Sequence, residues 1–418
     1  MKNSHSSHRP EPGSTVGADG APGGGAGPPR RILIAGGGFA ALEAMLALRA
    51  LLADRVEITL VSPEPQLAYR PAATAEVFHL GPPRAYDLRA MCEDLRVTYR
   101  RDRLEAVAPR QRCVRLASFA SVEYDALILA LGARAANAIP GALTFRDQRD
   151  IPQVRRLLAD LRRDALPRVV FAVPSGCTWP LALYELALMT SLYAEEHRMD
   201  IDVCIVTPER APLAVFGGEA SGVVARVLAD HGVRFRGDSV AVRVTREGSL
   251  ELHHGVSVAA DRVLAVPQLR GPRITGVPGD WWGFAPTDAR GRVEGMPDVY
   301  AVGDMTTYPI KQGGLAAQQA DEVACTIAEA HGVADPRRPE GERVLRARLL
   351  GGERPLFLHV ALDERGHPLA TTLEHDDGAP ATPGAQSGAA SATSSAAEKV
   401  FGRHLTAYLE RQKPLAAA

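Results

Sequence analysis

The sequence lacks the features that mark nucleic-acid-binding and membrane-spanning proteins. Its 418 residues include 48 basic and 49 acidic side chains, so it has no basic excess of the kind that a nucleic-acid-binding surface needs. No apolar run reaches the ~18 residues of a membrane span, because Glu43 and Arg49 interrupt the best candidate at residues 39–53. We therefore expect neither a nucleic-acid partner nor an integral membrane protein.

Cysteine and lysine are also scarce. The five cysteines are dispersed, without CxxC or metal-ligand spacing, which predicts reduced thiols in a cytoplasmic protein and no metal site. They are Cys92, Cys113, Cys177, Cys204 and Cys325. The lysines among the 48 basic residues are Lys2, Lys311, Lys399 and Lys413. Since the chain uses arginine wherever a generic cation suffices, a lysine inside a motif indicates a chemical reason for it.

Two segments have low-complexity composition. Residues 1–29 are rich in Gly, Pro, Ser and His, without apolar periodicity, and we expect them to be disordered. They offer no apolar stretch for a signal peptide. Residues 376–397 are rich in Ala, Ser, Gly and Thr, which is typical of a flexible linker.

Between these segments, short apolar runs alternate with helical patterns. This order favours an α/β fold with mostly parallel sheets. The βαβ pattern occurs twice, starting near residue 31 and near residue 168. Strands are expected at residues 31–35, 56–61, 126–130, 168–173, 202–206, 262–266 and 299–302, and helices at residues 40–53, 180–197, 219–231 and 315–331.

A glycine-rich turn follows the first predicted strand. It reads Gly-Gly-Gly-Phe-Ala-Ala, which is a G-x-G-x-x-A motif between a strand and a helix. Gly36 would form the tight turn, Gly38 would let the backbone approach a pyrophosphate, and Ala41 would keep the helix close to the strand. With Phe39 and Ala40, this turn opens a helix whose N-terminal N–H groups favour phosphate. The motif predicts a dinucleotide site.

The ribose-binding carboxylate that accompanies this motif is displaced. It ordinarily lies about 20 residues further on, at the end of the second strand. This chain has Ser62 at that place, with Glu64 two residues later. Either Glu64 reaches the ribose, or Ser62 binds it as a neutral acceptor.

Two later turns extend the pattern. One predicted strand ends in a turn with Ala130 and Gly132, and another ends in Gly303-Asp304. Together with the glycine motif, these turns resemble the flavoprotein superfamily with two dinucleotide-binding domains, from residue 31 to about residue 331. The resemblance implies FAD as the cofactor, with Asp304 binding its ribityl hydroxyls. A carboxylate suits that role because it accepts two hydrogen bonds at once.

Two further segments resemble the sulfide:quinone oxidoreductase and type II NADH dehydrogenase branch of that superfamily. One contains Arg70 and Pro71, and the other runs through Lys311, Gln312 and Gly313. The resemblance implies that Arg70 and Pro71 border the flavin, and that N–H groups from Gln312 onward face the pyrimidine end of its ring. Reduced flavin is negatively charged there, so a helix N-terminus and the Lys311 ammonium would favour it.

The second βαβ unit has a degraded nucleotide motif. Where an NAD(P)H domain carries its own glycine fingerprint, only Gly176 remains. Pro174 replaces the first glycine and donates no N–H, and Trp179 and Pro180 crowd the start of the helix. Glu209, after the next strand, is a candidate to bind a ribose hydroxyl. We therefore expect an NAD(P)-type domain with a poor phosphate cradle.

The cysteine positions weigh against sulfur chemistry. Disulfide reductases of the superfamily need a close cysteine pair soon after the glycine motif, and the sequence has none between Gly36 and Glu76. Cys177 is offset from the position at which the sulfide:quinone branch carries its cysteine, and Met305 stands where another would be expected. Cys325 fits a predicted helix as a small apolar residue. No catalytic residue is assigned.

The C-terminal segment allows two interpretations. Residues 355–361 and 368–374 read as strands, and a helical pattern at residues 399–411 places Phe401 and Leu405 on one face. That face either packs onto the protein body or a homodimer partner, or forms an interfacial helix. The resemblance implies that such a helix touches a membrane and guides a quinone.

The sequence therefore predicts two Rossmann-like domains and a function in electron transfer. An FAD domain at residues 30–139 and 291–335 is split by an NAD(P)-type domain at residues 140–290 and followed by a C-terminal segment at residues 336–418. We expect an FAD-dependent oxidoreductase that passes electrons from a small-molecule donor, NAD(P)H by default, to a quinone-like acceptor. Its expected location is the cytoplasm or the inner face of the membrane. The alternatives are a sulfide or other sulfur-species donor, and a non-catalytic, redox-responsive flavin-binding module.

Overall fold

The computed structural model describes most of the chain between residues 30 and 415. The described residues are 30–82, 84–163, 167–336, 338, 342–351, 355–374 and 399–415. The segment predicted to be disordered, residues 1–29, and the predicted linker, residues 376–397, lie outside them.

The first layer is a five-stranded parallel sheet built from both ends of the predicted FAD domain. Its order is β20-β9-β1-β2-β5, and every neighbouring pair is parallel. The three central strands are buried along most of their length, as a parallel sheet covered on both faces requires. The strands are β20 (Val299–Ala301), β9 (Ala126–Leu129), β1 (Arg31–Ala35), β2 (Glu57–Val61) and β5 (Thr98–Arg100).

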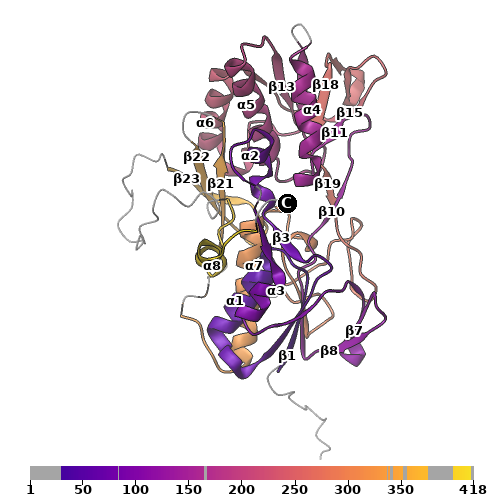
Figure 1. The fold of residues 1–418 in the computed structure, drawn as a ribbon, viewed down its shortest axis with the longest axis vertical. Helices are drawn as coiled ribbons and strands as arrows, with labels where there is room; N and C mark the ends of the chain where they lie inside the picture. The colour runs from indigo at the N-terminus through magenta and orange to yellow at the C-terminus, as the bar shows by residue number, and fades with distance from the viewer. Residues whose placement is uncertain are drawn as a thin grey trace, which may run out of the picture.

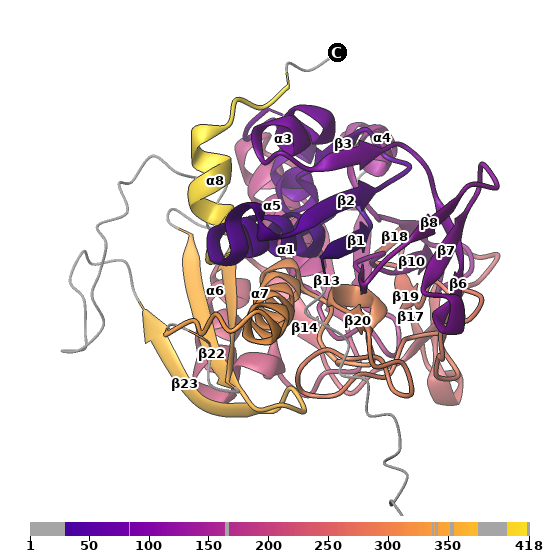
Figure 2. The ribbon, with the colours of Figure 1, turned by 90° about the horizontal axis from the view of Figure 1, so that it is seen from below.

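Helices cover one face of this sheet and a small meander covers the other. Helix α1 (Phe39–Leu52) lies beside α7 (Gly313–Ala330), and both share one apolar core with the sheet (Figure 2). On the opposite face, β6 (Leu104–Ala108), β7 (Cys113–Leu116) and β8 (Ser121–Glu123) pack over a second core. Between β2 and β5 the chain forms three short elements, β3 (Gln66–Ala68), α2 (Ala73–Val77) and α3 (Leu88–Asp94).

A second parallel sheet forms the other lobe in Figure 1. Its order is β11-β18-β12-β13-β14, and the pairing is parallel throughout. Its strands are β11 (Leu143–Thr144), β18 (Arg262–Ala265), β12 (Arg168–Ala172), β13 (Asp202–Val206) and β14 (Val233–Arg236). Around it lie α4 (Ile151–Leu161), α5 (Leu181–Glu196), α6 (Gly218–Asp230) and a meander of β15 (Ala241–Val244), β16 (Leu250–Leu252) and β17 (Ser257–Val258). The α/β class with two Rossmann-like units is confirmed.

An antiparallel strand pair runs between the two sheets. It consists of β10 (Arg134–Ala136) and β19 (Gln268–Arg270). The chain thus leaves the first sheet through β10 and returns through β19, as an inserted domain requires. The domain boundaries named above stay a prediction.

The C-terminal segment forms an antiparallel sheet and a short helix. The sheet contains β21 (Arg343–Leu349), β22 (Leu356–Leu362) and β23 (Pro368–Glu374), and its buried face packs against α5 and α7. Helix α8 (Leu405–Arg411) buries Leu405, Tyr408 and Leu409 against α1 and its neighbours. Among the described helices, none combines the length and apolar character needed to cross a bilayer.

The prediction of a helix at residues 399–411 was wrong for its first half. Residues 399–404 precede the helix, which begins at Leu405. The cause is Glu43 of α1, whose carboxylate accepts hydrogen bonds from the backbone N–H groups of His404 and Leu405 at 2.9 and 2.8 Å. A carboxylate that binds the first N–H groups of a helix fixes its start. Phe401 therefore lies outside the helical face assigned to it, and it is exposed.

Candidate functional site

Three turns meet at one edge of the first sheet. They follow β1, β9 and β20, which are adjacent and parallel, so their carboxyl ends share that edge. Backbone hydrogen bonds join the turns, from Ala130 N to Ala35 O at 2.8 Å and from Val302 N to Leu129 O at 2.9 Å. The structure thus brings together the segments that contain Gly36, Ala130 and Gly303, which lie far apart in the sequence.

The first turn requires a glycine. Gly36 has φ +125°, and a Cβ atom there would lie 2.1 Å from the carbonyl oxygen of Ala130. Its N–H donates to the carbonyl of Val61 at 2.8 Å. A larger residue would therefore force the first and second turns apart.

The N-terminus of α1 is open to an anion. Gly38 is its N-cap residue, and a Cβ there would meet no atom within 4 Å. No side chain from the described residues caps this helix, and its first turn has no acidic residue. The first N–H groups, from Phe39 to Ala41, therefore point their partial positive charge at open space. This arrangement fits the diphosphate of a dinucleotide.

Asp304 lies at the third turn without a hydrogen-bond partner. No donor to its carboxylate is found among the described residues, although the side chain is half-buried. Burial raises the pKa of Asp304, and the positive charges of Lys311 and Arg70 oppose that shift. A half-buried carboxylate without donors fits a ligand that supplies hydroxyl groups, as ribityl does.

Ser62 and Glu64 lie at the rim of this edge. Ser62 is buried, and its hydroxyl donates to the carbonyl of Glu64 at 3.2 Å. It lies against the first turn, since a Cβ at Gly37 would be 2.5 Å from Ser62 Oγ. The Glu64 side chain is exposed. Both residues therefore border the turn, and neither is singled out as the ribose acceptor.

Lys311 is held close to Asp304. Its ammonium donates to the carbonyls of Thr306 and Tyr308 at 2.5 and 2.6 Å, and it lies 4.0 Å from the centre of the Phe284 ring. Burial lowers the pKa of Lys311, while the negative charge of Asp304 opposes that shift. The predicted contact of Lys311 with a flavin ring stays a prediction.

The start of α7 is closed by the protein's own C-terminal segment. Gln312 caps the helix, its Oε1 accepting from Leu315 N at 2.8 Å, and its Nε2 donates to the carbonyl of Lys399 at 3.3 Å. A Cβ at Gly313 would lie 3.0 Å from side-chain atoms of Phe39 and of Val400. The three predicted residues of this helix start therefore lie beside α1, with residues 399–401 packed against them.

The sequence analysis missed a buried ion pair near Arg70 and Pro71. Lys399 Nζ lies 2.8 Å from Glu185 Oε2 of α5, and the two side chains are 9% and 2% exposed. Thr74 of α2 donates to the same carboxylate oxygen at 2.7 Å, and Lys399 also donates to the carbonyl of Pro71 at 3.0 Å. The scarcity of lysine was the available signal for Lys399; nothing in the sequence pattern marked Glu185.

Comparison with known proteins identifies the family. A family model described as pyridine nucleotide-disulphide oxidoreductase matches residues 30–322. The chain belongs to this family. No match was found among curated protein sequences.

The solved structures that share the fold are distant in sequence. A sulfide:quinone oxidoreductase from Aquifex aeolicus has a TM-score of 0.72 at 19% identity, covering 82% of this chain and 87% of that one. A ferredoxin reductase from Rhodopseudomonas palustris has a TM-score of 0.62 at 20% identity, covering 79% and 82%. NDH2 from Plasmodium falciparum has a TM-score of 0.54 at 16% identity, covering 66% and 64%. The resemblance to the two-domain flavoprotein superfamily is confirmed, and at these identities the neighbours establish the fold.

The second nucleotide turn of this oxidoreductase is held by contacts with other segments. Gly176 has φ +77°, and the amide of Gln268 donates to the adjacent Ser175 carbonyl at 3.1 Å. Thr178 donates to the carbonyl of Pro309 at 2.6 Å, which ties the turn to the first domain. Trp179 packs on Phe216 with ring centres 5.9 Å apart. Pro180 is the N-cap residue of α5 and has no N–H group, so this helix start is a poorer phosphate site than that of α1.

Glu209 already has internal donors. Its Oε2 accepts from the hydroxyls of Tyr184 at 2.7 Å and Thr207 at 3.1 Å, and its Oε1 accepts from Ala214 N at 3.3 Å. Burial raises the pKa of Glu209, and these hydrogen bonds oppose that shift. The geometry shows a structural carboxylate, so a ribose hydroxyl would have to compete with three protein donors.

The Cys177 thiol forms little thiolate at neutral pH. Burial raises its pKa to about 11, and the negative charge of Glu209 adds to the shift. The thiolate is the reactive form of cysteine, so this side chain is almost entirely the unreactive thiol at neutral pH.

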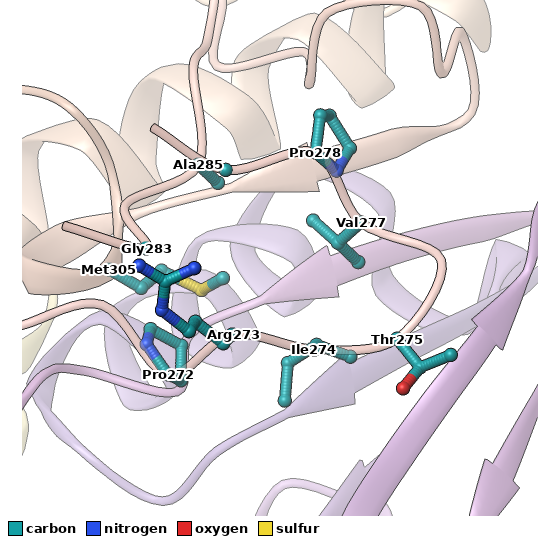
Figure 3. A pocket seen from close by; sticks show the side chains of 10 residues that line it. Pro272, Arg273, Ile274, Thr275, Val277, Pro278, Gly283, Ala285 and Met305 are labelled. Carbon is teal, nitrogen blue, oxygen red and sulfur yellow. The ribbon is translucent and has the colours of Figure 1, made fainter. Parts of the chain in front are cut away.

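A cavity of about 270 Å³ lies next to the third turn, on the loop that leads back into the first domain (Figure 3). Met305, which follows Asp304, lines it together with Arg273 and Ala285. None of the predicted cofactor-binding residues lines it. The cavity therefore borders the third turn, and its lining differs from the predicted cofactor-binding residues.

Proposed function

We propose that the protein is an FAD-dependent oxidoreductase that passes electrons from a reduced donor, NAD(P)H by default, to a quinone-like acceptor. The observation that carries this proposal is the meeting of the three turns, with the open N-terminus of α1 at one of them and the unpaired Asp304 carboxylate at another. An elongated ligand with a diphosphate and a polyhydroxyl chain satisfies both sites. FAD has these two parts, and it supplies the hydride and electron chemistry when bound.

The chain's own residues bind and orient this cofactor. The N–H groups at Phe39 to Ala41 receive the diphosphate, and Asp304 accepts hydrogen bonds from hydroxyls. Burial raises the pKa of Asp304, and the positive charges of Arg70 and Lys311 oppose that shift and so favour the ionised, accepting form of the carboxylate.

The donor site favours weak nicotinamide binding over sulfur chemistry. Pro180 provides no N–H group at the start of α5, and Glu209 is engaged by internal donors, so NAD(P)H would have to bind without a tight phosphate cradle. A sulfur donor would need a nucleophilic thiolate, and Cys177 with a pKa of about 11 does not provide one at neutral pH. NAD(P)H therefore remains the default donor.

The quinone-like acceptor is supported by the shared fold and by the C-terminal segment. The Aquifex aeolicus neighbour is named a sulfide:quinone oxidoreductase. In this chain, residues 399–401 cover the start of α7, and Phe401 is exposed with the Arg346 guanidinium 4.4 Å from its ring centre. The apolar side chains of α8 are buried on the protein body, which favours the packing interpretation of that helix. Peripheral membrane contact, homodimer formation and cytoplasmic location stay predictions.

An anaerobic titration tests the proposal. Purified protein is mixed in turn with NADH, NADPH and sulfide while the flavin absorbance is followed, and a water-soluble quinone is then added. We expect a nicotinamide nucleotide to bleach the flavin and the quinone to restore it. Bleaching by sulfide alone, lost in Cys177→Ser, would replace the proposal with the sulfur-donor alternative. A flavin that none of the three reduces would support the non-catalytic module.

A further inference from the structure

A cluster of buried ligand atoms lies where the C-terminal segment meets α1 and α7. Glu43 of α1, Asp321 of α7 and His404 each offer one atom, and these three atoms lie within 4.8 Å of one another. Glu43 and Asp321 are buried. The three residues come from distant parts of the sequence, so no local spacing connects them.

Two of these atoms have no hydrogen-bond partner among the described residues. They are Asp321 Oδ1 and His404 Nε2, and they lie 3.6 Å apart. The Asp321 side chain is 3% exposed, so water cannot readily satisfy its oxygen. A distance of 3.6 Å is too long for a hydrogen bond. An unsatisfied buried acceptor costs about 1–3 kcal/mol, so this pair points to a missing partner.

The spacing fits a metal ion between the two atoms. Zinc binds histidine nitrogen and carboxylate oxygen at about 2.0–2.2 Å, which places neighbouring ligands of a tetrahedral site about 3.4 Å apart. Asp321 Oδ1 and His404 Nε2 are close to that separation without any movement. The Glu43 carboxylate accepts two backbone N–H groups, yet a carboxylate has about four lone-pair positions, so it can bind an ion as well.

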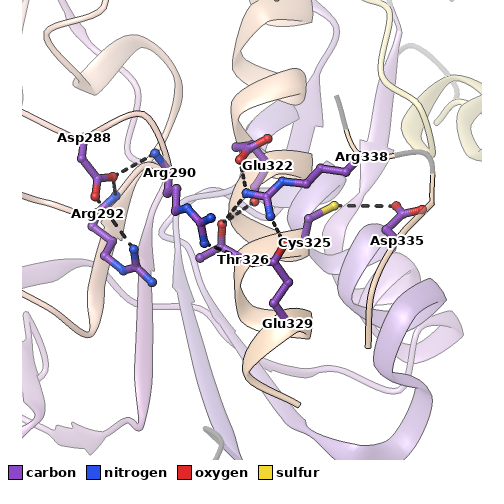
Figure 4. Close-up of polar contacts among 9 residues, drawn as sticks. All are labelled: Asp288, Arg290, Arg292, Glu322, Cys325, Thr326, Glu329, Asp335 and Arg338. Carbon is purple, nitrogen blue, oxygen red and sulfur yellow. Dashed lines mark hydrogen bonds and ion pairs between the residues drawn. The ribbon is translucent and has the colours of Figure 1, made fainter. Parts of the chain in front are cut away.

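The charges around the cluster favour a cation. Glu43 and Asp321 are buried acidic side chains, and the Arg403 guanidinium lies 3.3 Å from Asp321 Oδ2 and 2.6 Å from Asp335 Oδ2. The guanidinium binds Oδ2 of Asp321, so Oδ1 stays available to an ion. Figure 4 shows the neighbouring end of this region, where Cys325 Sγ lies 3.7 Å from Asp335.

We propose that Glu43, Asp321 and His404 form a binding site for a first-row divalent cation such as Zn²⁺. One imidazole and two carboxylates are a ligand set that suits this class of ion, and the two carboxylates attract a dication. The His404 side chain is 21% exposed, which provides a path for the ion to enter.

The ion would cross-link the C-terminal segment to the first domain. His404 belongs to that segment, whereas Glu43 and Asp321 belong to the two helices that cover the first sheet. The sequence analysis expected no metal site because it relied on local spacing of ligands. The site is assembled only by the packing of α1, α7 and residues 399–405.

Calorimetric titration of the full-length flavin-loaded protein with Zn²⁺, after treatment with a chelator, tests the proposal. We expect wild-type protein to bind one ion that is bound at least about tenfold more weakly in Asp321→Asn and in His404→Gln, since each removes a ligand. Glu329→Gln is the matched control, because it removes one negative charge from the same helix outside the cluster. It should bind as wild type does.

Limited proteolysis supplies a second readout. Zn²⁺ should slow tryptic cleavage at Arg403 and Arg411 in wild-type protein and in Glu329→Gln, but not in His404→Gln. If Asp321→Asn does not fold, His404→Gln decides, because that side chain is partly exposed. The proposal is overturned if wild-type protein binds no Zn²⁺, or if both ligand variants bind it with unchanged affinity and stoichiometry.

Discussion

Loss of the Lys399 ammonium should destabilise the protein strongly, and Lys399→Met is the substitution that tests this. The side chain lies between the second domain and the first, with its ammonium 2.8 Å from Glu185 of α5 and 3.0 Å from the carbonyl of Pro71. Methionine keeps the length of the chain and removes the charge. Glu185 would then be buried with its negative charge uncompensated, although Thr74 and the Leu350 N–H would still donate to it.

The magnitude follows from burial. Because the two side chains are 9% and 2% exposed, water cannot screen or replace the lost partner. Removing one member of a buried ion pair typically costs about 3–5 kcal/mol. For a stability of ~5–15 kcal/mol, that loss is a large fraction of the total. A surface lysine, by contrast, contributes about 0–1 kcal/mol.

Urea unfolding of a double-mutant cycle measures the effect. We expect Lys399→Met and Glu185→Gln each to lower the free energy of unfolding by about 3–5 kcal/mol, and the double variant to cost less than the sum. Lys413→Met is the matched control, because that lysine is exposed near the C-terminus. A coupling energy below about 0.5 kcal/mol between Lys399 and Glu185, the level at which independent sites simply add, would refute the reasoning.

Three further predictions concern the nucleotide sites. Asp304→Ala should lose hydrogen bonds of about 1.5–3 kcal/mol each to the ribityl chain, and hence most bound FAD; an unchanged flavin-to-protein absorbance ratio would contradict this. Glu209→Gln should lower stability to thermal unfolding while leaving the ratio of NADH to NADPH rates unchanged, because its oxygens serve Tyr184 and other internal donors; an altered ratio would show that Glu209 faces the ribose. Alkylation of Cys177 should accelerate about tenfold per pH unit from pH 7 towards its pKa of about 11, since only the thiolate reacts, and mass spectrometry of the labelled peptide would reveal an earlier plateau if the thiol were activated.

The sequence predicted the central strands and the first nucleotide motif well, because local physics determines them. The strand at residues 31–35 was placed at the bounds of β1, since a fully buried parallel strand reads as a continuous apolar run. Gly36 was predicted at the tight turn from the G-x-G-x-x-A motif, and the structure agrees, since Gly36 has a φ of +125°. In both cases the neighbours in sequence carry the information.

The features that were missed depend on contacts between distant segments. The start of α8 is determined by Glu43, more than 360 residues earlier in the chain. Glu209 accepts a hydrogen bond from the hydroxyl of Tyr184 in α5, and no sequence motif connects these two residues. The ion pair between Glu185 and Lys399 joins a helix of the second domain to the C-terminal segment. Sequence patterns report such side chains only as candidates, since their partners are chosen by tertiary packing.

The two nucleotide sites differ because the chain uses its side chains differently at each. At the first, the N-terminus of α1 has no side-chain cap, and the Asp304 carboxylate has no donor among the described residues. Both groups can therefore bind a ligand. At the second, the helix begins with Pro180, which has no N–H group, and Glu209 accepts its hydrogen bonds from protein donors.

The C-terminal segment then links both halves. Lys399 binds the second domain through Glu185, while Arg403 binds Asp321 and Asp335 at the first. Its two buried attachments lie four residues apart, on either side of Val400, which packs against the start of α7. Since that helix start borders the open site, a change that weakens either attachment should alter the flavin environment as well as the stability of the fold. A shift of the flavin absorbance in Lys399→Met, absent in Lys413→Met, would demonstrate this link.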